Sequence, residues 1–167
     1  MITNLIFIIL RFKKSMKRSV AFFFIICFVL LFSIQSSAQK KSPILNHIAH
    51  YVVDLKVSTD FYLNIVGLDS IPEPFHDGRH TWLSVGYKSH LHLISGAVEK
   101  KVQDKNAHLC FSVESVNDFI KVLKAHNIEY ESWLGEKNSV TNRTDGVKQI
   151  YFKDPDGYWL EINDAKD

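Results

Sequence analysis

The chain has 167 residues, 46% of them hydrophobic, and a formal net charge of +2 at pH 7. Five of its twenty Lys and Arg residues precede position 39, whereas none of its eighteen Asp and Glu residues do. The remainder therefore carries fifteen positive and eighteen negative side chains, a net charge of −3. It contains no cluster of basic residues that would follow a phosphate backbone, so we expect no nucleic-acid partner.

Residues 1–38 differ in composition from the rest and are predicted to be a leader with a secretory signal peptide. A basic stretch at 13–18 precedes an apolar run at 20–34, and Ser36-Ser37-Ala38 offers small residues to a signal peptidase. The run is shorter than the roughly 20 residues of a membrane span, although an uncleaved anchor is the alternative. We expect Met16 to be the true start, 39–43 to be a short linker, and the cleaved product to be exported, periplasmic or secreted, without stable membrane insertion.

The segment 44–164 is predicted to be one domain in which the same unit occurs twice. His47-Ile-Ala-His-Tyr-Val is matched by His108-Leu-Cys-Phe-Ser-Val, 61 residues later. The turn pair Asp77-Gly78 matches Asp145-Gly146, and His90-Leu-His92-Leu matches Trp159-Leu-Glu161-Ile at an offset of 69 residues. Three matches in the same order predict a duplication, with module 1 at about 44–98 and module 2 at about 105–164.

Each copy is predicted to fold as β-α-β-β-β, an α+β architecture. In the first copy, alternating polarity predicts strands over 45–53, near Ser70, over 82–85 and over 90–94. A helix is predicted over 57–66, ending at Gly67. Its start is capped by Ser58 or Asp54. Its buried face is expected to carry Val57, Phe61, Tyr62 and Ile65.

In the second copy, strands are predicted over 107–113, 129–133, 149–153 and 158–163. A helix over 116–125 is expected to bury Phe119, Val122 and Leu123. Asp154-Pro155-Asp156-Gly157 predicts a tight turn, because Pro presets φ and Gly permits a positive φ. The polar segment 135–146 is expected to be a mobile loop that covers a site.

Four potential metal ligands occupy two pairs of repeat-equivalent positions: His47 with His108, and His92 with Glu161. If the two copies pack about an approximate two-fold axis, equivalent positions converge and the four side chains meet. Imidazole and carboxylate groups are ligands for Zn, Ni, Fe(II), Co or Mn, and four of them leave positions free for substrate or water. We therefore predict one divalent metal ion bound by His47, His92, His108 and Glu161.

Further residues are candidates for substrate contacts. Ala49 and Tyr51 share the strand face of His47, and His90 shares the face of His92. Arg79 and Lys148 occupy matching positions after the turns and would suit an anionic substrate, although solvation at the surface is the default. Tyr151 is a further candidate, although a tyrosine in a strand more often belongs to the core.

Three stretches resemble the glyoxalase, bleomycin-resistance and extradiol-dioxygenase group, the vicinal oxygen chelate superfamily: Asn46–Tyr62, Ala107–Val113 and Asp154–Glu161. The resemblance covers about residues 44–164. It implies two βαβββ modules forming a half-open barrel, a homodimer with the site shared between modules, and metal ligands at His47, His92, His108 and Glu161.

The resemblance also implies chemistry on a small substrate with vicinal oxygens, through a metal-stabilised enediolate. The pattern is similar to lactoylglutathione lyase (glyoxalase I), and Glu161, as the only carboxylate of the set, is the expected catalytic proton shuttle. Bacterial relatives of that enzyme commonly have a second Glu where this chain has His92. A non-catalytic binding module of the bleomycin-resistance type, an Fe(II) dioxygenase and a thiol transferase are the alternatives.

Overall fold

The computed structural model describes residues 42–166, of which Ile44 onward form one compact unit. The predicted leader and most of the predicted linker lie outside the described residues. No helix in the described part of the chain is long and apolar enough to cross a membrane.

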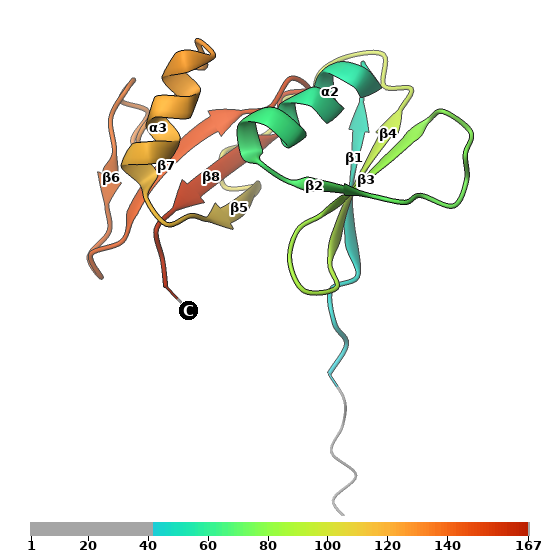
Figure 1. Cartoon of the computed structure of the whole chain (residues 1–167). Coiled ribbons are helices and arrows are strands. Elements are labelled where there is room, and N and C mark those ends of the chain that lie inside the picture. The colour runs from blue at the N-terminus through green and yellow to red at the C-terminus, as the bar shows by residue number, and fades with distance from the viewer. Residues whose placement is uncertain (1–41, 167) are drawn as a thin grey trace, which may run out of the picture. The chain divides into compact units, whose positions relative to one another are not determined.

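The first module is a mixed four-stranded sheet with one helical segment (Figure 1). Its strands are β1 (His47–Val52), β2 (Asp69–Ile71), β3 (His80–Ser84) and β4 (His90–Ser95). They lie in the order β1-β4-β3-β2, with β1 parallel to β4 and the other pairs antiparallel. The helical segment, α2 (Leu55–Phe61) continued by a π-helical turn (Tyr62–Val66), packs against β3 and β4.

The second module repeats this topology. Its strands are β5 (His108–Ser112), β6 (Thr141–Asn142), β7 (Lys148–Lys153) and β8 (Trp159–Asn163), in the order β5-β8-β7-β6. Helix α3 (Val116–Ala125) packs against β7. The identical strand order and the equivalent parallel pairs confirm the predicted duplication into βαβββ modules. Both sheets are open, as expected for a half-open barrel.

Local sequence explains where the helices begin and end. Asp54 caps α2 by accepting a hydrogen bond from the Val57 N–H, and Ser115 caps α3 in the same way from the Asp118 N–H. The π-helical turn ends at Gly67, which has a φ of 83° that favours glycine.

Most of the buried face predicted for the first helix is confirmed, because Tyr62 and Ile65 are buried and Phe61 is partly buried. The exception is Val57, which is 50% exposed. Its neighbour Ser58 is buried instead, because the Ser58 hydroxyl faces the second module and donates to Asp156. In α3, Phe119 and Leu123 are buried as predicted and Val122 is partly buried.

The outer edge of the second sheet also differs from the prediction. The strand expected over 129–133 is reduced to isolated bridges at Glu131, which pairs with Lys137 and with Tyr151. The edge strand is β6, inside the segment expected to be a loop. The reason is local. The Ser132 N–H donates to the Glu136 carbonyl, and the Glu136 N–H donates to the Ser132 hydroxyl. The Trp133 N–H donates to the Thr141 hydroxyl. These contacts use groups that a longer strand would pair.

One hydrophobic core spans both modules, with buried members from β1, β3, β4, β7, β8 and both helices. A buried polar network joins the modules beside it. Tyr62 of the first module donates to Asp154 of the second at 2.8 Å, and Ser58 donates to Asp156 at 2.5 Å. The His50 ring stacks on Tyr158 with centroids 3.8 Å apart. The predicted Asp154–Gly157 turn therefore also anchors one module on the other.

Candidate functional site

Two of the four candidate ligands, His47 and His92, form a pair on the first sheet. The Cα partners in the parallel ladder are His47 with His90 and Ala49 with His92, so His47 and His92 are diagonal neighbours on one face. Their rings stack with centroids 4.3 Å apart. The His47 Nδ1 lies 2.8 Å from the Asn46 side-chain oxygen. A hydrogen bond there leaves the Nε2 of His47 available to a ligand.

His92 is buried, and its environment suits a neutral, metal-binding imidazole. Burial lowers its pKa, and the neighbouring His47, His90 and His80 lower it further. The Trp82 ring stacks on the imidazole at 4.1 Å. Among the described residues, the buried Nε2 of His92 has no hydrogen-bond partner. A buried nitrogen without a partner is costly in a protein, and coordination of a cation would satisfy it.

The other two candidates, His108 and Glu161, form the equivalent pair on the second sheet. Cys110 is the Cα partner of Glu161, so His108 and Glu161 are diagonal neighbours in the same way as His47 and His92. The Nε2 of His108 lies 3.2 Å from a carboxylate oxygen of Glu161. The two pairs occupy the same positions in their modules, which is the relation that the repeat predicted.

The bonding of His108 favours a cation between it and Glu161. Its Nδ1 lies 2.7 Å from the Lys105 carbonyl oxygen, which only accepts, so Nδ1 must carry a proton. In the neutral ring, Nε2 then presents a lone pair to the carboxylate. Two acceptors at 3.2 Å need a positive charge between them, either a proton on Nε2 or a metal ion.

Glu161 is held by donors on both oxygens. The Tyr151 hydroxyl donates to one oxygen at 2.6 Å and the Asn163 amide to the other at 2.9 Å. Burial acts to raise the pKa of Glu161, but hydrogen bonds from Tyr151, Asn163 and Cys110 and the nearby His108 outweigh it and lower the pKa below its usual value. Burial and the same carboxylate raise the pKa of Tyr151, which keeps its hydroxyl protonated as a donor.

The four candidate ligands are two pairs rather than one cluster. No group of three or more His, Cys, Asp or Glu side chains in residues 42–166 is arranged to hold a metal ion. The donor types and the unpartnered nitrogen fit a divalent metal, but one chain holds the candidate ligands as two separate pairs, which we call the first half-site (His47 and His92) and the second half-site (His108 and Glu161).

The other predicted site residues divide into two groups. Ala49 and Tyr51 lie exposed on the face of His47, His90 lies 6.0 Å from the His92 ring, and Tyr151 contacts Glu161 directly. Arg79 is exposed and donates to the Ser95 carbonyl. Lys148 alternates with Gln149 along β7 and so lies on the opposite face from Tyr151 and Glu161.

The structure adds contacts that the sequence did not indicate. Asn163 follows Glu161 by two positions on the same strand, so strand alternation alone could have identified it as a neighbour of the carboxylate. Asn46 is adjacent to His47 and orients its ring. Lys105 binds His108 through its carbonyl oxygen, and no pattern in the sequence marks it.

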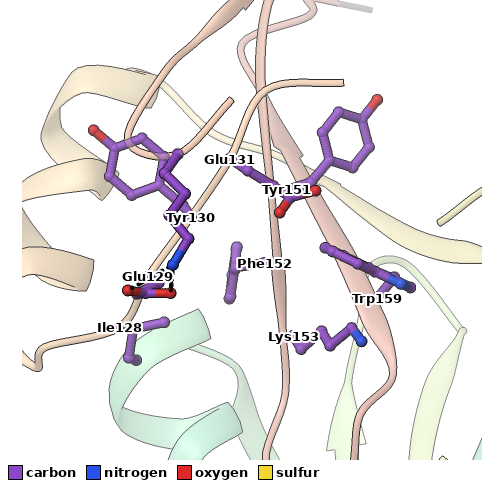
Figure 2. Close-up of a pocket in the computed structure, with 9 residues that line it drawn as sticks. Ile128, Glu129, Tyr130, Glu131, Tyr151, Phe152, Lys153 and Trp159 are labelled. Carbon is purple, nitrogen blue, oxygen red and sulfur yellow. Dashed lines mark hydrogen bonds and ion pairs between the residues drawn. The ribbon is translucent and has the colours of Figure 1, made fainter. Parts of the chain in front are cut away.

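A cavity of about 390 Å³ lies beside the second half-site (Figure 2). Tyr151, Lys153 and Trp159 line it from β7 and β8, and the segment 128–131 lines it as well. None of the four candidate ligands lines it. The cavity therefore lies beside the second half-site without containing its candidate ligands.

The profile of the glyoxalase/bleomycin resistance protein/dioxygenase superfamily matches residues 44–162. The chain belongs to this superfamily. The match spans both modules, which confirms the family resemblance of the three sequence stretches.

Proteins that are similar to this chain have different activities in their names. Glyoxylase I 4 of Arabidopsis thaliana is 29% identical over 125 residues, which cover 71% of this chain and 68% of the plant protein. Metallothiol transferase FosB of Staphylococcus epidermidis is 26% identical over 128 residues, covering 71% of this chain and 79% of that protein. The solved structure of oxidase ChaP-H1 matches with a TM-score of 0.62 at 23% identity, over 75% of this chain and 98% of its own, and supports the fold alone.

Proposed function

We propose that this superfamily member is a metal-dependent lyase or isomerase that acts on a small substrate with two neighbouring oxygen atoms. His47, His92, His108 and Glu161 are the proposed ligands of one divalent ion. The observation that carries the proposal is the pair of acceptors formed by His108 Nε2 and Glu161 at 3.2 Å, together with the unpartnered Nε2 of His92. A similarity to glyoxylase I 4 supports the reaction class.

The complete site is proposed to form between two copies of the chain. Because each chain supplies two separate half-sites, the His47–His92 pair of one protomer would face the His108–Glu161 pair of the other. Such a two-fold arrangement makes two identical sites in a homodimer. A divalent ion held by these four residues would have coordination positions left for a substrate.

Each side chain of the proposed site has a separate role. A bound divalent ion supplies Lewis-acid stabilisation of the negative charge that develops on the substrate oxygens. Glu161 is ionised at neutral pH, since its pKa lies below the usual value, and it accepts a proton from one substrate carbon and returns it to the neighbouring carbon. Tyr151 and Asn163 keep the carboxylate in place. His90 and Tyr51 line the same face as His47 and are proposed to contact the substrate.

Mixing two variants tests the shared site. His47→Ala/His92→Ala removes the first half-site, and His108→Ala/Glu161→Ala removes the second. Neither variant should bind zinc, but a dimer of one copy of each retains one intact site and should bind about one ion. Isolating the mixed dimer through two different affinity tags makes the stoichiometry measurable. Zinc binding by either parent variant at the wild-type level would refute this ligand set, and a mixed dimer without zinc would refute the shared site.

A non-catalytic role as a ligand-binding module is the competing proposal. A binding module of this kind does not need four metal ligands, so it would retain its ligand after chelation. Turnover in a metal-reconstituted screen of hemithioacetals, small α-hydroxyketones and catechols, absent from the metal-free protein, separates the two. Product from the thiol-containing substrates would favour a lyase, and oxygen consumption with catechols would favour a dioxygenase.

We also propose that the domain is exported, on the basis of the leader sequence. Mature protein outside the cytoplasm would meet different substrates from those of a cytosolic thiol enzyme. We therefore define the proposed substrate only as a small molecule with two neighbouring oxygen atoms, and we do not propose that it is a glutathione adduct.

A further inference from the structure

Lys105 is enclosed by aromatic rings beside the second half-site. Its ammonium lies 5.2 Å from the centre of the Trp159 ring, 5.6 Å from that of Tyr151 and 6.0 Å from that of Trp133. Its side chain is only 16% exposed and forms an ion pair with Glu131. We call this enclosure the cation cage: the rings of Trp133, Tyr151 and Trp159 with the Glu131 carboxylate.

The ammonium of Lys105 has no donor left for a substrate. Besides the Glu131 carboxylate, it donates to the carbonyl oxygens of Ser132 at 3.2 Å and Trp133 at 3.1 Å. A lysine ammonium has three N–H donors, so these partners use all of them. Lys105 is therefore not placed to bind an anionic ligand, and its function must lie in what it holds.

Lys105 holds the carbonyl that orients His108. Its carbonyl oxygen lies 2.7 Å from the Nδ1 of His108. The short turn between the two residues is closed by the Ala107 N–H, which donates to the Asp104 carbonyl at 3.0 Å. The segment before the turn is fixed by Trp159, whose indole N–H donates to the Gln103 carbonyl at 3.0 Å. The Trp159 indole and the backbone bond of the 104–107 turn thus fix the position of the Lys105 carbonyl oxygen.

One ring of the cation cage, that of Tyr151, also contacts the proposed ligands. Tyr151 packs edge-on against the His108 ring, with centroids 5.5 Å apart, and its hydroxyl donates to Glu161 at 2.6 Å. Trp159 is the Cα partner of His108 in the sheet. The Lys105 ammonium therefore lies over a ring that contacts both His108 and Glu161.

We propose that Lys105 is a positioning residue for the second half-site, an inference that rests on the proposed function. Its caged ammonium fixes its own carbonyl oxygen, which keeps the proton of His108 on Nδ1 and leaves Nε2 for the metal ion. Partners of this kind that orient ligand imidazoles typically change metal affinity by about 10–100-fold when lost.

The test compares Lys105→Met with two other variants. Lys105→Met keeps the length of the stem but removes the charge that the cage holds. Lys105→Arg keeps the charge. The matched control is Lys153→Met, because Lys153 also lies over the Trp159 ring, at 4.7 Å, but the carbonyl oxygen bonded to His108 belongs to Lys105. Each protein is studied as the full mature chain, with circular dichroism as the check on folding.

Two readouts separate this inference from the proposed function. In metal-free protein labelled with ¹⁵N-histidine, NMR should find Nδ1 of His108 protonated in the wild type and in the Lys153→Met and Lys105→Arg variants. In Lys105→Met a substantial share of Nδ1 should lose its proton. Zinc affinity, measured by competition with a chromophoric chelator, should fall at least tenfold in Lys105→Met and less than twofold in Lys153→Met.

The outcomes are distinguishable. If Lys105→Met keeps Nδ1 of His108 protonated, Lys105 does not position the ring and the inference is wrong. If the ring responds as expected but no form of the protein binds zinc, the proposed function fails while the positioning role stands. Should Lys105→Met not fold, Glu131→Gln loosens the cage by removing only the ion pair. An unchanged His108 ring in that variant would likewise overturn the inference.

Discussion

Replacing Tyr62 by Phe removes one hydroxyl from the network that joins the modules. Tyr62 is fully buried, and its hydroxyl donates to Asp154 at 2.8 Å. The other oxygen of Asp154 already accepts from the backbone N–H groups of Asp156 and Tyr158. After the substitution, the first oxygen retains only His50, whose Nδ1 lies 3.8 Å away. A buried carboxylate oxygen would thus lose its one close donor.

The expected cost follows from the charge and burial of the acceptor. A hydrogen bond to a charged group contributes about 1.5–3 kcal/mol, and the side chain of Asp154 has no exposed surface from which water could replace the donor. We therefore expect Tyr62→Phe to lower the free energy of unfolding by about 2–3 kcal/mol. For a domain of this size, that corresponds to a fall in Tm of about 6–15 °C.

Urea unfolding followed by tryptophan fluorescence measures this change, and Tyr130→Phe is the matched control. Tyr130 is also buried, but its hydroxyl donates to the neutral carbonyl of Asn138 at a longer 3.3 Å. The control should lose less than about 1 kcal/mol. Because one core spans both modules, each protein should unfold in a single transition. Equal losses in the two variants would refute the reasoning about the buried carboxylate.

Three further predictions concern other parts of the chain. Gly157→Ala should destabilise the fold more than Gly146→Ala, by about 1–3 kcal/mol in urea unfolding. Both glycines have a φ of 90°, but only at Gly157 would the new methyl group collide with the Lys101 carbonyl. Equal losses of stability would show that the collision is relieved. Glu161→Gln should reduce turnover more than its loss of metal explains, and normal turnover by a metal-loaded variant would exclude Glu161 as the proton acceptor. Protein recovered from outside the cytoplasm should begin near Gln39 by N-terminal sequencing, and an intact Met1 there would contradict signal cleavage.

The duplicated fold was predictable because three matching sequence stretches occur in the same order in both halves of the domain. The helix over 116–125 was predicted to the residue, since Ser115 caps it and its apolar positions follow the helical period. The end of the first helix at Gly67 was predicted correctly, but its start lies at Leu55 rather than Val57, and its π-helical turn is not visible as an apolar pattern. The strand expected over 129–133 failed because the Thr141 hydroxyl and the Glu136 backbone carbonyl accept hydrogen bonds from its N–H groups.

The repeat identified which residues of the two modules are equivalent, His47 with His108 and His92 with Glu161, and it predicted that the four side chains would meet. Strand alternation places His47 near His92 and His108 near Glu161, and the structure has both pairs. Alternation assigns a residue to a face of its own sheet, but it carries no information on which other sheet that face meets. For that reason the sequence could not distinguish one four-ligand cluster in a chain from two half-sites.

Metal content tests the central claim most directly. After incubation with Zn, Ni or Mn and removal of free ions, elemental analysis of the wild-type protein should find about one divalent ion per chain. His92→Ala and His108→Ala, one from each half-site, should both reduce that content strongly, whereas His50→Ala, which removes a buried histidine outside the pairs, should not. A wild-type protein without bound metal under all three conditions would contradict the proposed site.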